Sequence, residues 1–543
     1  WQDYDKALIS KGGGVFSRAA KSAALTPEIR KLLDIKAEAV TPAELMKAIL
    51  KAPVELFWLG GIGTYVKASD EDHAAAGDRA NDAVRIDGRD LRARVIGEGA
   101  NLGLTQLGRI EYARAGGRLN TDAIDNSAGV DSSDHEVNIK ILLSSAIEHG
   151  DLKSEARNEL LRSMTENVAA HVLRHNYDQT RALSIMQASA PGDLDAHARL
   201  MSAFEHEGRL DRKIEFLPDA EDIAALKARG QGLTRPELAI LLAYSKMWLF
   251  EALVDSAAPD DPMLERELFA YFPEELHGFK DAIVRHRLRR EIIATRLSNE
   301  IVDSCGASFP HRTIEATGAR PADVALAYEA ARRILNLGSF AGAIDTLDNV
   351  IPAALQIELY NTASELLREQ LYRIVSDPHA SALLERRGLK GMIEQYGEPV
   401  AAFKQALPSI LPPGAAKALA ARVEHWLGSG APEEIAREAA LMPALERAFD
   451  VVNLARETGW SSEAAGAVYF AVGHRFGIDA ARDQSRENPP ADHYDRLAAR
   501  RLLEDLSARQ SALAASVIAF AKKEPQKGDW LQDLGKQWPG PGA

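Results

Sequence analysis

Three short polar side chains, Asn101, Asn126 and Ser133, stand beside glycine-rich turns within one stretch of the chain, residues 95–143. An asparagine carboxamide both donates and accepts hydrogen bonds, as recognition of a sugar hydroxyl or a cofactor amide requires. Asparagine is also common in turns for purely local reasons. A serine hydroxyl at a helix N-terminus can help to bind an anion, but it can equally well only cap its helix. The residue types alone therefore leave a binding role and a local structural role open, and favour the local one.

The elements around these residues predict how they are positioned. A β-branched run at residues 94–96 leads into a glycine turn that includes Gly99, and a helical segment follows it. A second extended piece at 118–120 leads to the turn 126–130, which includes Gly129. Alternating strands, glycine turns and helices are typical of a doubly wound α/β sheet, where ligands lie at the carboxyl ends of the strands.

We expect a helix to begin at Ser133 and to run to Ile147. Ser133 and Glu136 have the spacing of a capping box, and apolar residues at helical spacing follow them. This predicts the hydroxyl of Ser133 at the positive end of the helix dipole.

An earlier stretch, residues 54–59, reads as a buried strand that ends in Gly60 and Gly61. Val66 stands where a dinucleotide-binding fingerprint needs its third glycine, so this is a weak fingerprint. We interpret it as a later strand of the same sheet, whose glycines let the backbone pass close to a cofactor. The charged, alanine-rich residues 70–83 predict a helix.

Beyond Gly150 the pattern is helical, with apolar residues at three- and four-residue spacing and no convincing strand. Residues 190–193 are expected to form a loop. The predicted fold class is therefore α/β plus all-α: the C-terminal half of a Rossmann-type doubly wound domain over residues 1–150, followed by a large all-helical domain over residues 151–543. A break near residues 378–415 could divide the helical domain into two sub-bundles.

Composition excludes several classes of partner. The 543 residues carry a net charge of −14, which argues against binding nucleic acid through its phosphates. The apolar runs are too short for a membrane span, and one cysteine, Cys305, fits a reducing cytoplasm. Asp131 and Asp134 lie near His135, but their spacing is not that of a zinc site, so we predict no metal.

Several runs resemble the large NAD-dependent glutamate dehydrogenases of bacteria. These runs are LFWLGGIGTYVKAS at 56–69, DRANDAVRI at 78–86, GEGANLGLTQLGRIEYA at 97–113 and GGRLNTDAIDNSAGVDSSDHEVNIKILL at 116–143. LTRPELAILLAYSK at 233–246 and HRLRREIIATRLSNEIV at 286–302 extend the resemblance into the helical region. The small hexameric glutamate dehydrogenases are similar only at the two turns near Asn101 and Asn126.

The resemblance implies a function for each of these sites. The reaction would be NAD-dependent oxidative deamination of L-glutamate to 2-oxoglutarate and ammonium. Ser133 would bind the side-chain carboxylate of the substrate, and the remaining residues would bind NAD: Asn101, Asn126, Gly60, Gly61, Gly99 and Gly129.

The resemblance also implies what this chain does not contain. We find neither the family's lysine motif nor its catalytic aspartate. The missing motifs and a start at Trp1 rather than methionine favour a piece of a longer polypeptide. We expect this piece to be inactive alone and to be completed by an upstream part of the same polypeptide. The expected location is the cytoplasm, and the expected assembly is a homo-oligomer.

Two other interpretations remain open. The first is a non-catalytic helical assembly or regulatory module with a partial nucleotide fold, since nothing beyond residue 150 looks catalytic. The second is a dehydrogenase of another amino acid. Such enzymes replace the carboxylate-binding serine with an apolar residue, so Ser133 favours glutamate.

Overall fold

The computed structural model describes residues 5–488, 490 and 492–523. The chain divides into two compact units. The first comprises Trp1–Met247, Leu268–Arg289 and Gly306–Ser308, and the second comprises Trp248–Glu267, Arg290–Cys305 and Phe309–Ala543. The last described strand ends at Glu98 and the chain is helical from residue 122, both inside the first unit. The expected domains 1–150 and 151–543 therefore stay a prediction.

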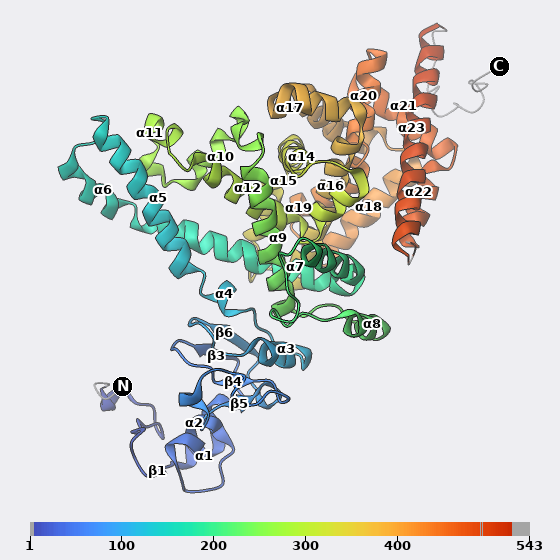
Figure 1. Ribbon diagram of the computed structural model, residues 1–543. Coiled ribbons are helices and arrows are strands. Elements are labelled where there is room, and N and C mark those ends of the chain that lie inside the picture. The colour runs from blue at the N-terminus through green and yellow to red at the C-terminus, as the bar shows by residue number, and fades with distance from the viewer. Residues whose placement is uncertain (1–4, 489, 491, 524–543) are drawn as a thin grey trace. The chain divides into compact units, whose positions relative to one another are not determined.

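The strands lie in the first 100 residues and form three pairs (Figure 1). The parallel pair β3–β6 joins Leu56–Leu59 to Val95–Glu98. The other pairs are β1 (Ala23–Ala24) with β2 (Ala39–Val40), antiparallel, and β4 (Val66–Lys67) with β5 (Ile86–Asp87), parallel. The expected extended piece at 118–120 contributes one parallel bridge, between Arg118 and Val95. The described strands thus form short pairs and not one continuous wound sheet.

Side-chain caps explain where the first helices begin. Helix α1 (Pro27–Leu33) follows Thr26, and α2 (Pro42–Leu50) follows Thr41, which makes a reciprocal capping box with Glu44. Proline at the first helical position suits both starts. Helix α3 (Gln106–Arg114) begins after Thr105, whose hydroxyl accepts a hydrogen bond from the backbone N–H of Gly108.

Two expectations for this region are wrong. Strand β3 is not buried on both faces, because the side chains of Leu56 and Trp58 are exposed and only Leu59 is fully buried. Residues 70–83 form turns and one short 3-10 helix instead of an α-helix. There, Asp72 accepts a hydrogen bond from the backbone N–H of Ala75 at 2.8 Å, and short acidic side chains that bond to nearby backbone compete with helix formation.

From residue 122 onward the described chain is helical, with no strand among its described residues. The helices of the first part are α4 (Asp122–Asp125), α5 (Ala128–Glu148), α6 (Arg157–Ser163), α7 (Thr165–His206), α8 (Ala220–Ala228), α9 (Arg235–Val254), α10 (Glu265–Tyr271) and α11 (Lys280–Val284). The prediction of a large helical region beyond residue 150 is confirmed for the described residues.

The later helices form the bulk of the second unit. They are α12 (Arg289–Cys305), α13 (Phe309–Thr317), α14 (Pro321–Ile334), α15 (Leu337–Asp345), α16 (Ala353–Ser376), α17 (Pro378–Ile410), α18 (Pro413–Gly428), α19 (Glu433–Leu445), α20 (Ala448–Thr458), α21 (Ser462–Arg475), α22 (Ile478–Glu487) and α23 (His493–Lys523). Helix α14 packs against α16 and α17. Its Tyr328 is fully buried.

The loop expected at residues 190–193 does not form. Pro191 lies inside α7, a continuous helix of 42 residues. Ala190 and Leu194 on either side are buried, and burial of this apolar face outweighs the local cost of a proline. In the described part of the chain, no helix has both the length and the apolar character needed to cross a membrane.

Candidate cofactor and substrate site

The site is built on a buried ion pair at the carboxyl end of β6. Glu98 is the last residue of β6, and its carboxylate accepts hydrogen bonds from Arg109 Nε at 2.7 Å and Nη2 at 2.9 Å. Both side chains are almost fully buried. Burial raises the pKa of Glu98 above its ordinary value, although Arg109 opposes the shift. The carboxylate also accepts from the N–H of Leu104 at 3.2 Å, so the pair closes the glycine turn that follows β6.

A second carboxylate joins β6 to the segment before α5. Asp125 accepts a hydrogen bond from the N–H of Glu98 at 2.9 Å and from Asn120 Nδ2 at 2.6 Å. Burial raises the pKa of Asp125, while its hydrogen bond with Asn120 lowers it. The end of β6 and the segment just before α5 are therefore held together by partly buried polar contacts.

The two predicted cofactor asparagines meet at this junction. Asn126 Nδ2 donates a hydrogen bond to Asn101 Oδ1. Asn101 is exposed and Asn126 is half-buried, so a ligand can reach both carboxamides. The sequence placed each in a separate turn, and the structure brings the two turns together.

The predicted glycines are all exposed, but they differ in what surrounds them. A Cβ atom added at Gly61 or Gly129 would have no heavy atom within 4 Å, and one at Gly60 would meet only the Trp58 indole at 3.5 Å. At Gly99, by contrast, a Cβ would lie 2.3 Å from Trp58 Cζ2. The position of the Trp58 indole therefore explains why residue 99 is a glycine, without any contribution from a bound cofactor.

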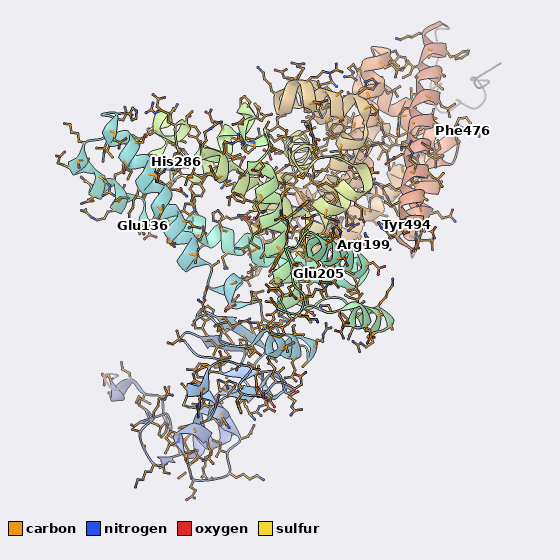
Figure 2. All side chains as sticks on the ribbon, in the orientation of Figure 1. Glu136, Arg199, Glu205, His286, Phe476 and Tyr494 are labelled. Carbon is orange, nitrogen blue, oxygen red and sulfur yellow. The ribbon has the colours of Figure 1, made fainter. Side chains whose placement is uncertain are left out.

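Ser133 does not cap a helix, contrary to the expectation. Helix α5 begins at Ala128, so Ser133 is its sixth residue, and its exposed hydroxyl donates to the carbonyl of Val130 at 2.7 Å. Glu136, which lies on the same helix (Figure 2), pairs with Lys140 instead of completing a capping box.

The helix starts early because the turn before it is fixed from another element. Asn176 on α7 donates to the carbonyl of Ile124 at 2.7 Å and to Ser127 Oγ at 3.1 Å. The carbonyl of Ser127 then accepts the N–H of Asp131, which starts the helical pattern before Ser133.

Arg235 connects the segment before α4 to α7, a contact that the sequence did not reveal. Its guanidinium donates to Asn120 Oδ1, to Ser184 Oγ at 2.9 Å and to the carbonyl of Thr180 at 2.8 Å. Burial lowers its pKa to about 10. Its partners come from distant parts of the chain, so no local pattern could have revealed the role.

Two family models match this chain. Residues 1–186 match the family model described as bacterial NAD-glutamate dehydrogenase, catalytic domain. Residues 230–539 match the model described as glutamate dehydrogenase, C-terminal.

Three curated relatives are each named NAD-specific glutamate dehydrogenase. The protein from Pseudomonas aeruginosa is 41% identical over 98% of this chain and 33% of its own length. The protein from Halomonas elongata is 38% identical and that from Mycobacterium tuberculosis 36%, each over 96% of this chain and 32% of its own length. The chain thus spans about one third of the length of these relatives. It belongs to the bacterial NAD-glutamate dehydrogenase family.

Proposed function

We propose that this chain takes part in the NAD-dependent oxidative deamination of L-glutamate to 2-oxoglutarate and ammonium. The observation that carries the proposal is the contact between Asn101 and Asn126, two accessible carboxamides where β6 ends and α5 begins. The names of the three relatives, NAD-specific glutamate dehydrogenase, support the same reaction. Membership of this family also speaks against a purely non-catalytic helical module.

We infer that residues 1–150 belong to a Rossmann-type domain. Support comes from the parallel register of β3 on β6 and from the parallel bridge between Val95 and Arg118 on the other edge of β6. In such sheets the cofactor lies at the carboxyl ends of the strands. Gly60 and Gly61 follow the end of β3, and Gly99 follows the end of β6.

Within this proposal, each residue has a distinct task. NAD supplies the hydride acceptor. Asn101 and Asn126 hold the nicotinamide end of the cofactor, while open space at Gly61 and Gly129 admits it close to the backbone. The hydroxyl of Ser133 turns from the Val130 carbonyl to donate to the side-chain carboxylate of glutamate. The general base lysine and the proton-carrying aspartate come from an upstream part of the same polypeptide, in a cytoplasmic homo-oligomer.

Replacement of Ser133 by alanine in the full-length enzyme tests the proposal. A hydrogen bond to a charged group contributes about 1.5–3 kcal/mol, so S133A should lower kcat/KM for glutamate by about ten- to a hundredfold. The KM for NAD should stay the same. Because Ser133 is exposed and inside a helix, alanine should not lower the melting temperature.

The matched control is Ser144→Ala, an exposed serine further along α5, which should leave both Michaelis constants unchanged. Wild-type glutamate kinetics in S133A would contradict the assignment of Ser133. A higher KM for NAD in S133A would place the residue in the cofactor half of the site instead.

A further inference from the structure

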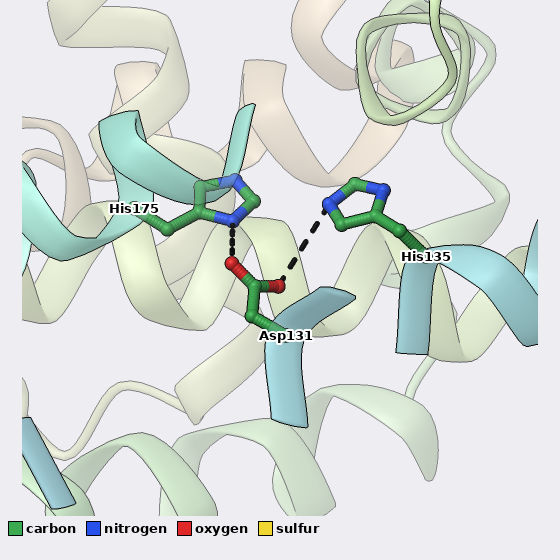
Figure 3. Close-up of side chains that lie close together, drawn as sticks. All are labelled: Asp131, His135 and His175. Carbon is green, nitrogen blue, oxygen red and sulfur yellow. Dashed lines mark hydrogen bonds and ion pairs between the residues drawn. The ribbon is translucent and has the colours of Figure 1, made fainter. Parts of the chain in front are cut away.

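A histidine and carboxylate cluster lies between α5 and α7 (Figure 3). His175 Nδ1 lies 2.9 Å from Asp131 Oδ2, and His135 Nε2 lies 3.8 Å from Asp131 Oδ1. The three potential ligand atoms all lie within 4.8 Å of one another. Figure 3 shows both imidazoles turned toward the two oxygens of the one carboxylate.

The two helices hold this cluster in place. Asp131 and His135 are four residues apart and share one face of α5. Helix α7 packs against α5, and Asn176, next to His175, anchors α7 to the turn before α5. The ring of Tyr271 stacks on His135 with the ring centroids 4.4 Å apart, which fixes the plane of this imidazole.

The cluster combines rigidity with access. The side chain of His135 is fully buried, whereas 25% of the Asp131 side-chain surface and 33% of that of His175 are exposed. An ion could therefore enter from the side of Asp131 and His175. His171 lies one turn before His175 on α7, with its ring centroid 5.6 Å from that of His135.

The donor set is selective for a class of metal. Two imidazoles and one carboxylate suit borderline divalent transition metals such as Zn²⁺ and Co²⁺, whereas Mg²⁺ and Ca²⁺ prefer oxygen ligands. Ligands about 2.0–2.1 Å from a tetrahedral zinc ion are about 3.3 Å apart. The two His–Asp separations, 2.9 Å to Oδ2 and 3.8 Å to Oδ1 of Asp131, are near that value although they involve different oxygens of the carboxylate. We propose that Asp131, His135 and His175 bind a divalent transition-metal ion that clamps the first turns of α5 to α7.

This site is separate from the proposed substrate residue. Ser133 is two residues from both Asp131 and His135, and residues two apart on a helix do not share a face. Loss of the metal site and loss of carboxylate binding can therefore be measured independently. The local spacing of Asp131, Asp134 and His135 argued against a metal because it could not include His175, 44 residues away from Asp131.

Metal titration of the 543-residue chain tests the proposal. After treatment with a chelator and its removal, Co²⁺ is added and followed by visible absorption, and Zn²⁺ is added and followed by calorimetry. We expect one ion per chain in this site and a higher melting temperature with Zn²⁺, since an ion that binds the folded state stabilises it. Mg²⁺ at the same concentration should do neither.

The informative variants are His175→Ala and Asp131→Asn, because these side chains are partly exposed and their loss should leave the fold intact. Outer-shell changes already weaken metal sites by about ten- to a hundredfold, so loss of a ligand should weaken Zn²⁺ binding by at least about a hundredfold and abolish the increase in melting temperature. His206→Ala removes an exposed histidine from the far end of α7 and should bind Zn²⁺ as the wild type does.

Unchanged Zn²⁺ affinity in both ligand variants, or no binding to the wild type at micromolar Zn²⁺, would overturn the proposal. Variants that only lower the metal-free melting temperature would overturn it too, and would make the cluster a simple contact between helices.

Discussion

The residue contact that shapes the candidate site most is the ion pair between Glu98 and Arg109. Its two hydrogen bonds are buried, and Arg109 Nη2 also lies 3.1 Å from Asp122. Removing one partner of a buried pair leaves an uncompensated charge, which is more costly than replacing the whole pair by apolar side chains. The pair therefore controls the conformation of the turn that carries Asn101.

We expect Arg109→Met to destabilise the protein by about 3–5 kcal/mol at neutral pH. The loss should be smaller at acidic pH. With Arg109 gone, burial and the nearby charge of Asp122 still raise the pKa of Glu98, opposed by the hydrogen bond from the N–H of Leu104. The folded state then keeps a proton that the unfolded state has lost. Stability is then highest below the unfolded pKa of Glu98 and falls as pH rises through the folded one. Urea unfolding at pH 5 and pH 8 measures this.

The double variant Glu98→Gln with Arg109→Met serves as the control, because it removes both charges and should recover part of the lost stability and most of the pH dependence. An R109M protein with the same loss of stability at both pH values would show that Glu98 is not the group responsible.

Sequence reasoning could point to single residues in local turns. The family resemblance singled out Asn101 and Asn126, and the structure brings the two side chains into contact where β6 ends and α5 begins; their role in binding stays a prediction. Sequence reasoning failed where a residue acts through a distant element. Arg235 bonds to residues 115 and 51 positions away, and His175 to one 44 positions away. Spacing along a chain contains no information about such pairs.

At the scale of elements, the spacing of a capping box occurs both at a helix start and inside a helix. Thr41 with Glu44 caps α2, whereas Ser133 with Glu136, where we expected a helix start, lies inside α5. The difference lies in the preceding backbone. Val40 ends a strand before Thr41, but the turn before Ser133 is already held in a helical start by α7. A capping box marks a start only where the chain before it is extended.

The early start of α5 places Gly129 in its first turn, and this leads to a prediction. A Cβ at Gly129 would meet no atom within 4 Å, so Gly129→Ala should keep or raise stability, by up to about 1 kcal/mol. If bound NAD passes close to the backbone at residue 129, the added methyl group clashes with it. Overpacking costs at least about 1 kcal/mol, so the KM for NAD in the full-length enzyme should rise about fivefold or more.

Steady-state kinetics and thermal melting together decide this. Gly192→Ala in α7 is the matched control, because it also adds a methyl group to a helical glycine with open space around it and should change stability alone. An unchanged KM for NAD in G129A would remove Gly129 from the cofactor site.

At the scale of the whole molecule, helical periodicity predicted the character of the chain but not its division. The region beyond Gly150, for which the pattern predicted helices, contains long helices such as α16 and α23. The chain, however, passes from one compact unit to the other several times, near residues 248, 268, 290, 306 and 309. One of these boundaries coincides with Gly306, which has a positive φ. The others fall within or next to helices of similar composition, where the tertiary packing of apolar faces decides the division.

The second unit contains a buried acidic network that should dominate its response to pH. Glu300 on α12 pairs with Arg332 on α14, and Arg332 also lies 3.7 Å from Glu329. Although 25% of the Glu300 side-chain surface touches solvent, its other sides are closely packed. Burial raises its pKa from 4.5 to about 7, against the opposing effect of Arg332 and with a further contribution from Glu267.

We therefore expect stability to fall as pH rises from 4.5 to about 7. Over this range the folded state retains a proton on Glu300 that the unfolded state has released. Unfolding therefore releases a proton, and a higher pH favours unfolding.

Glu300→Gln removes this titration, while Arg332 keeps Glu329 as a partner. The decline in melting temperature between pH 4.5 and pH 8 should then be smaller in E300Q than in the wild type. Glu424→Gln, an exposed glutamate on α18, should retain the wild-type decline. An equal decline in E300Q and the wild type would mean that Glu300 is ionised throughout and that the arginines around it outweigh its burial.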